Sequence, residues 1–154
     1  MAEKFNLALR SARELKGLDA NAGKMFGLSA NEWYDLEQHV DEWSMVTPAY
    51  VIRCIVSYFE LDWPAFYDWP SGVIRVPTSR DQGLDGFIRK IREKNNLSRE
   101  DFSDRVGFNA TFAEVIEGHP EGLLLWPLEP AMLLARAFDI DGRSLAGRLL
   151  KPYW

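Results

Sequence analysis

Residues 97–117, with the sequence LSREDFSDRVGFNATFAEVIE, predict two short helices joined at a glycine corner. Ser98, followed three residues later by Asp101, is typical of a helix N-cap with part of a capping box. Phe102 and Val106 are four residues apart and would share one face of the first helix. This arrangement is the first half of a helix-turn-helix pattern.

The corner falls at Gly107. A residue that ends a helix here must adopt positive φ, which disfavours residues with a Cβ by roughly 1 kcal/mol. Asn109 can cap the following helix, and Phe112 or Ala113 together with Ile116 would form its inward face. In a DNA-binding protein this second helix would enter the major groove.

The composition is that of a globular protein with one or two small domains. The chain has 154 residues, of which 47% are hydrophobic and 27% charged. Cys54 is the single cysteine, so an intrachain disulfide and a thiolate-rich zinc site are excluded, and we expect a reducing, cytoplasmic location. Its apolar neighbours predict that Cys54 is buried. No apolar run approaches the roughly 18 residues that span a bilayer, so we expect no membrane partner.

The charge is unfavourable for general binding to nucleic acid. Eighteen Lys and Arg against 23 Asp and Glu give a net charge of −5, so any contact with phosphates must be local. Residues 1–66 carry 6 basic and 10 acidic side chains, and residues 80–154 carry 11 and 12. The second part of the chain is therefore the better candidate for binding DNA. A local positive edge around its first two predicted helices, or simply a solvated helix face, is expected from Arg89, Lys90, Arg92, Lys94, Arg99 and Arg105.

The chain repeats itself. Residues 9–18 resemble residues 88–97 at an offset of 79, and residues 27–37 resemble residues 107–117 at an offset of 80. The coincident pairs are Arg10/Arg89, Arg13/Arg92, Glu14/Glu93, Leu18/Leu97, Gly27/Gly107, Ala30/Ala110 and Glu37/Glu117. Two copies of one fold are predicted.

We expect five helices in each copy and almost no strand. The predicted helices are 6–16, 19–26, 29–37, 48–59 and 63–67 in the first copy, and 84–95, 98–106, 109–116, 129–138 and 141–149 in the second. Residues 1–67 and 84–154 are then two domains, joined by a Pro- and Gly-containing linker at 68–83 that includes a short extended piece at 73–76.

The helix order and the runs LSREDFS, GFN and IE, with ARAFDI near the end, resemble the lambda-repressor-like (Xre/Cro-type) helix-turn-helix family. The resemblance implies an all-α fold of two tandem five-helix domains and binding to double-stranded DNA through the third helix of each. It implies phosphate or base contacts at Ser98, Arg99, Arg105, Asn109, Ala110, Thr111 and Glu114 in the second copy, and at Asn21, Ser29, Ala30, Asn31 and Tyr34 in the first.

Two features depart from the family pattern. A glutamine usually begins the family's second helix, but this chain has Ala20 or Asn21 in one copy and Arg99 in the other. Gly23 falls inside the second helix of the first copy, where glycine is unfavourable by about 1 kcal/mol relative to alanine. The first motif is thus degenerate.

A second function stays open, because the predicted third helices are poor in cations. Residues 29–37 and 109–117 contain acidic side chains and no Lys or Arg, whereas base reading usually employs Arg, Lys, Asn or Gln. The alternative is a protein-interaction module that kept the fold and lost the DNA site. Its interface candidates are Trp43, Trp69, Trp126 and Trp154, which could equally pack between the copies, whereas Trp33 is expected in the core.

Catalysis and cofactors are not expected. His39 and His119 occupy matching positions without neighbouring ligand residues, so a zinc site is not predicted. The glycines form no phosphate-binding pattern, and no serine lies in a nucleophile motif.

Overall fold

The computed structural model describes residues 3–78 and 83–151, and in these ranges the chain is all-helical, with two isolated bridges as its β-structure. The elements of the first half are α1 (Phe5–Leu15), η1 (Ala22–Phe26), α2 (Ala30–Gln38), α3 (Glu42–Met45), α4 (Ala49–Tyr58) and η2 (Trp63–Phe66). Those of the second half are α5 (Leu84–Lys94), α6 (Arg99–Val106), α7 (Ala110–Gly118), η3 (Gly122–Leu125), α8 (Leu128–Ala137) and α9 (Gly142–Leu150). The η elements are 3₁₀ turns.

The predicted helix–corner–helix lies at α6 and α7. The Ser98 hydroxyl accepts a hydrogen bond from the Asp101 amide at 3.0 Å, and Gly107 has φ of 105°. The Ser103 hydroxyl accepts from the Ala113 amide, which ties the two helices together behind the corner. Asn109 is the N-cap residue of α7, but its side chain makes no capping hydrogen bond, so that expectation was wrong.

The first half does not match the second helix for helix. Its second and fifth elements, expected at 19–26 and 63–67, are the 3₁₀ turns η1 and η2. Gly23 explains the first difference, since a Cβ at this position would lie 2.7 Å from Trp33 Cβ. Glycine here lets η1 approach the buried indole of Trp33, which is 1% exposed, so Trp33 is in the core as predicted.

The two halves meet at equivalent positions. Pro48 and Pro127, 79 residues apart, form an antiparallel bridge, and the Ala49 amide donates to the Trp126 carbonyl at 2.9 Å. Proline has no backbone N–H group, but it fits this pairing because the neighbouring residue, Ala49, donates the hydrogen bond. Element α3 packs on α8 and, reciprocally, η3 packs on α4. Such reciprocal contacts are those of an isologous dimer interface, here within one chain.

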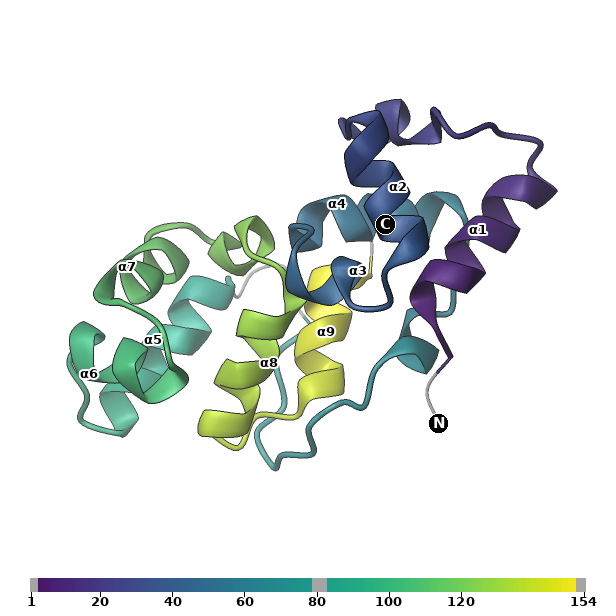
Figure 1. Ribbon diagram of the computed structural model, residues 1–154. Coiled ribbons are helices and arrows are strands. Elements are labelled where there is room, and N and C mark those ends of the chain that lie inside the picture. The colour runs from purple at the N-terminus through teal and green to yellow at the C-terminus, as the bar shows by residue number, and fades with distance from the viewer. Residues whose placement is uncertain (1–2, 79–82, 152–154) are drawn as a thin grey trace.

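Helix α9 and the linker complete the junction. Figure 1 shows α8 and α9 between the α5–α7 group and the first half, and α9 packs on both α4 and α8. The extended piece predicted at 73–76 is present, with Ile74 paired in parallel to Ile140. A Cβ on Gly72 would lie 2.4 Å from the carbonyl carbon of Ile140, and a Cβ on Gly142 would lie 2.4 Å from Pro70 Cδ. Glycine at these two positions therefore allows the linker to pack closely on the α8–α9 loop. The linker is thus packed along the second half.

A polar group bridges the halves beside η2. The Tyr67 hydroxyl donates to Glu129 of α8 and accepts from Arg136 Nη2 at 3.3 Å. Burial, assisted by the hydrogen bond to Glu129, raises the pKa of Tyr67 to about 12. The neutral phenol is therefore the form that the folded protein favours.

We predict opposite effects of alanine at two glycines. Gly107→Ala should lower the free energy of unfolding by about 1 kcal/mol, because the residue must keep positive φ. Gly86→Ala, inside α5 with open space where a Cβ would lie, should raise it by roughly 0.5–1 kcal/mol. Urea unfolding measures both, and the same sign for the two variants would contradict the assignment of the corner.

We also predict an alkaline destabilisation that depends on Tyr67. Its pKa is higher in the folded chain, so its contribution to stability is complete below the ordinary value of 10.0 and is lost as pH rises toward about 12. Thermal melts across this interval should show a smaller decline for Tyr67→Phe than for wild type. Tyr34→Phe, at an exposed tyrosine, should follow wild type.

Candidate nucleic-acid interface

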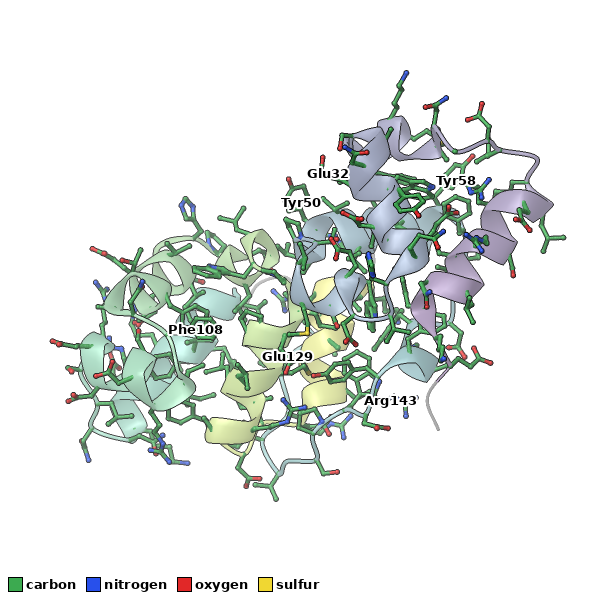
Figure 2. The ribbon with its side chains drawn as sticks, viewed as in Figure 1. Glu32, Tyr50, Tyr58, Phe108, Glu129 and Arg143 are labelled. Atoms are coloured by element: carbon green, nitrogen blue, oxygen red, sulfur yellow. The ribbon has the colours of Figure 1, made fainter. Side chains whose placement is uncertain are left out.

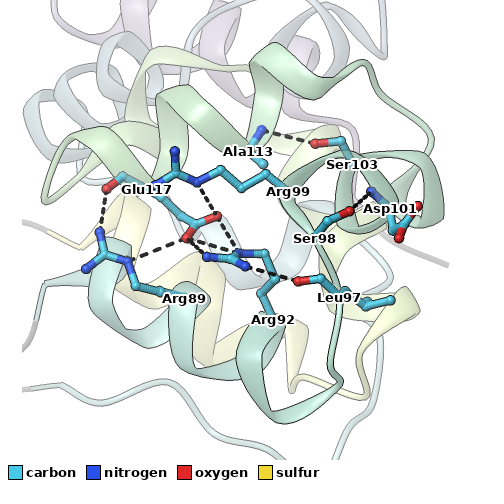
Figure 3. A network of polar contacts seen from close by, with 9 residues as sticks. All are labelled: Arg89, Arg92, Leu97, Ser98, Arg99, Asp101, Ser103, Ala113 and Glu117. Carbon is cyan, nitrogen blue, oxygen red and sulfur yellow. Dashed lines mark hydrogen bonds and ion pairs between the residues drawn. The ribbon is translucent and has the colours of Figure 1, made fainter.

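The centre of the candidate site is a carboxylate at the end of α7. The Glu117 side chain is 0% exposed, and Arg92 of α5 binds both of its oxygens at 3.0–3.2 Å. Arg92 also donates to the Leu97 carbonyl at 3.0 Å, in the loop that leads to α6. One arginine thus joins α5, the α5–α6 loop and α7 (Figure 3).

Two further arginines approach the same carboxylate from the surface. Arg89 Nε lies 3.5 Å from Glu117 Oε1, and Arg99 Nε lies 3.8 Å from Oε2. Their side chains are 44% and 50% exposed, so each guanidinium faces both the buried charge and solvent. Three positive charges thus surround one negative charge. We call this group the arginine cluster; it consists of Arg89, Arg92, Arg99 and Glu117.

The first half contains a reduced version of this cluster. Arg13 Nε binds Glu37 Oε1 at 2.5 Å and Arg13 Nη1 donates to the Leu18 carbonyl at 2.9 Å, at positions equivalent to Arg92, Glu117 and Leu97. The hydrogen bond to the glutamate is the main cause of a raised pKa in both Arg13 and Arg92. Within residues 3–78 and 83–151, Glu37 forms an ion pair with Arg13 alone. Arg10 is the counterpart of Arg89, but the counterpart of Arg99 is the uncharged Ala20, so the first cluster is smaller.

The remaining predicted contacts of the second half lie on the surface of α6 and α7. Asn109, Ala110, Thr111 and Glu114 are exposed on α7, and Ser98 is exposed at the start of α6. Arg105 is exposed too, but its guanidinium lies 4.7 Å from the centre of the Phe138 ring. Arg99 therefore contacts the last turn of α7 through Glu117, whereas Arg105 is directed to Phe138 at the end of α8.

The predicted contacts of the first half are also exposed but chemically different. Asn21 is the N-cap residue of η1, Ser29 and Glu32 form a complete capping box, and Asn31 and Tyr34 lie on the open face of α2. The Ser29 hydrogen bonds lower the pKa of Glu32, so this carboxylate stays charged. Asp35 and Glu32 accompany Tyr34, and α2 contains no Lys or Arg.

The tryptophans differ in their surroundings. Trp43 is 3% exposed and stacks on Phe5 at 4.8 Å, so it is a core residue and not an exposed interface residue. Trp69 is half-buried against Trp63 and Tyr67, and its indole N–H donates to the Pro64 carbonyl. Trp126 contacts Phe108 and Phe112 while its carbonyl joins the first half. Trp154 lies outside the described residues.

Other expectations about single side chains had mixed outcomes. Cys54 is exposed on α4, so its predicted burial was wrong: the inward positions of this helix are Val51, Ile52, Ile55 and Val56. His39 is exposed and lies 3.7 Å from Asp35 Oδ1. In residues 3–78 and 83–151 no three His, Cys, Asp or Glu side chains gather as a metal site, and no helix there has the length and apolar character to cross a bilayer.

Sequence reasoning did not predict the ion pairs of Arg13 with Glu37 and of Arg92 with Glu117. An Arg and a Glu recur together at matching positions of the repeat, and this joint recurrence was the signal that could have predicted the two pairs.

Comparisons of the chain with protein-family models, curated proteins and solved structures find no match. The candidate interface is therefore defined by its own geometry.

We predict that the buried carboxylate is needed for stability. Glu117→Gln should lower the free energy of unfolding by about 3 kcal/mol, since it leaves Arg92, whose side chain is 15% exposed, without its counter-charge. Glu114→Gln, three residues earlier and exposed, should change it by less than about 0.5 kcal/mol. Denaturant unfolding of the two variants measures both changes, and equal unfolding midpoints would show that the arginine cluster adds no net stability.

Proposed function

We propose that this chain is a DNA-binding protein of the transcriptional-regulator type, built from two tandem helix-turn-helix domains of the lambda-repressor-like kind. In this proposal α6 and α7 form the active motif, and α7 enters the major groove. The first half acts as a built-in partner in place of a second subunit.

The observation that carries the proposal is the open face of α7 beside the arginine cluster. Asn109, Thr111 and Glu114 are exposed side chains that can donate to or accept from base edges. Arg89 and Arg99, half-exposed beside the last turn of α7, can reach phosphates while Arg92 neutralises Glu117. This local positive charge allows phosphate contacts although the net charge of the chain is −5.

The motif is also rigid enough to present these groups. Ser98, Gly107 and the Ser103–Ala113 hydrogen bond set the angle between α6 and α7, and Phe102 and Phe112 are 0% exposed beneath them. A base-reading helix held by a packed scaffold places its side chains with little loss of entropy on binding.

A protein-interaction module is the second candidate, and the surface of α2 favours it. Tyr34 is 60% exposed between the acidic residues Glu32 and Asp35. Phosphates would be repelled by this face, so α2 cannot serve as a second reading helix. The two candidates are compatible if the halves have different tasks.

We predict different effects of two substitutions on DNA binding. Arg99→Ala should weaken binding to all duplexes alike and reduce the salt dependence by about one unit of log–log slope, because a phosphate contact is lost. Thr111→Ala should change sequence preference more than salt dependence. Gel shifts with random duplexes at several salt concentrations measure both.

The matched control is Arg143→Ala. Arg143 is exposed at the start of α9, away from α7 (Figure 2), and its loss should leave the slope unchanged. Melting curves of the three variants confirm that they are folded. If the intact chain has no affinity for any duplex at low salt, where non-specific binding is strongest, DNA binding is refuted.

A further inference from the structure

Four apolar side chains are exposed where the two halves join. Met45 ends α3 and Val46 follows it, Tyr50 lies in the first turn of α4 (Figure 2), and Leu125 ends η3, with exposed fractions of 57%, 59%, 46% and 55%. We call these four residues the junction patch. Buried side chains such as Ala49, Leu123 and Leu128 already fill the joint, so the fold itself does not require the exposed ones.

Backbone contacts bring this patch together from both halves. Pro48 is bridged to Pro127, and the Ala49 amide donates to the Trp126 carbonyl. Tyr50 directly follows Ala49, and Leu125 directly precedes Trp126. Val46 is two residues before Pro48. The patch is therefore a property of the joined chain, and neither half alone would present it.

Acidic groups border the patch. The Val46 amide donates to the Glu42 carbonyl at 3.1 Å, which places Glu42 one turn from Met45 and Val46. Partial burial and then the charge of Asp35 raise the pKa of Glu42, while His39 opposes the shift. Glu42, Asp35 and exposed Asp41 thus form an acidic rim on the first-half side.

Acidic side chains outnumber cations in the chain segments on both sides of the junction. Residues 25–52 and 106–135 contain no Lys or Arg, and Arg53 follows one turn after Tyr50 on α4. Four of the nine acidic residues in these segments are ion-paired with arginines from elsewhere, namely Glu37, Glu117, Glu121 and Glu129. The others are Glu32, Asp35, Asp41, Glu42 and Glu114. An apolar surface beside Asp35, Asp41 and Glu42 is complementary to a partner of the opposite charge.

We propose that the junction patch binds a protein segment that carries apolar side chains flanked by Lys and Arg. The apolar side chains would cover Val46, Tyr50 and Leu125, and the cations would pair with the acidic rim. Exposed apolar side chains gathered at one joint, with a polar border, are typical of protein-binding sites. Nucleic acid is disfavoured by its phosphates, and a second copy of this chain would bring a second acidic rim against the first.

This proposal goes beyond DNA binding and does not depend on it. The contacts to duplex would come from α6, α7 and the arginine cluster, whereas the partner segment would lie on α3, α4 and η3. One chain could then hold DNA and a basic protein segment at once, and each activity can fail without the other.

The test uses a defined probe and the full chain. A fluorescein-labelled amphipathic peptide of Leu and Lys, about four helical turns long, is titrated with the protein, alongside a peptide in which Glu replaces every Lys. We expect saturable binding of the Leu–Lys peptide that weakens as salt is added, and no binding of the Leu–Glu peptide.

Matched variants locate the binding surface. The double variant Val46→Ser/Leu125→Ser should weaken binding of the Leu–Lys peptide about tenfold or more. The control Leu15→Ser/Val73→Ser removes side chains of similar character that are 88% and 83% exposed elsewhere, and it should change binding less than about twofold. Equal losses in both double variants, or none in the junction variant, would refute the proposal.

Two further measurements separate loss of the binding surface from misfolding and from self-association. If the junction variant melts at a lower temperature than wild type, the variant Asp41→Lys is used in its place. This change lies at an exposed rim position, so it should weaken binding of the Leu–Lys peptide and leave the melting temperature unchanged. Sedimentation of the wild-type chain should show a monomer; a dimer that the junction variant abolishes would identify a second copy as the occupant and overturn the assignment. A gel shift with duplex DNA is expected to be the same for the junction variant and wild type.

Discussion

The buried pairing of a glutamate with an arginine organises both halves of this protein. In each half the last turn of one helix carries a carboxylate that an arginine of the first helix binds, as Glu37 with Arg13 and Glu117 with Arg92. The same arginine holds the carbonyl of Leu18 or Leu97. The first helix, the loop that follows it and the end of α2 or α7 therefore meet at one guanidinium, whose planar donors suit a carboxylate and a carbonyl together. A charge so deeply buried is tolerated only because it is paired and hydrogen-bonded.

The difference between the halves follows from what surrounds that pair. In the second half Arg89 and Arg99 add two positive charges whose guanidinium groups reach solvent, so the pair becomes the base of a cationic edge. In the first half the pair stands beside acidic α2, and the neighbouring turn η1 is shortened around Gly23. A Cβ at Gly23 would meet Trp33, so glycine at this position allows η1 to pack closely on the indole. Both halves retain the stabilising pair, and one of them carries the cationic edge.

Sequence reasoning identified the helical class, the glycine corner and the repeat because these depend on local signals. Capping residues, Gly107 and hydrophobic spacing act over four or five residues. It missed the 3₁₀ character of η1, the exposure of Cys54 and the burial of Trp43, because these depend on contacts between distant segments. Trp43 follows a loop, but Phe5 and Phe66 enclose it. The arginine cluster could have been inferred from the matched Arg and Glu pairs, whereas the junction patch could not, since its members come from positions 45–50 and 125.

The junction determines how the two surfaces can act together. In a homodimer, equivalent faces would be identical, so a cationic reading face would be paired with another cationic face. Here the equivalent of α7 is α2, and neither helix contains Lys or Arg, but Arg89 and Arg99 lie beside the end of α7. The two halves are fixed on one chain by the Pro48–Pro127 bridge and by Tyr67, Glu129 and Arg136. Fusion allows this asymmetry, because a single chain can change one copy without changing the other. In the functions that we propose, the acidic first half would favour a basic protein segment, and the arginines beside α7 would favour phosphates. The two halves thus differ in what surrounds the shared Arg–Glu pair, and the junction patch lies between them.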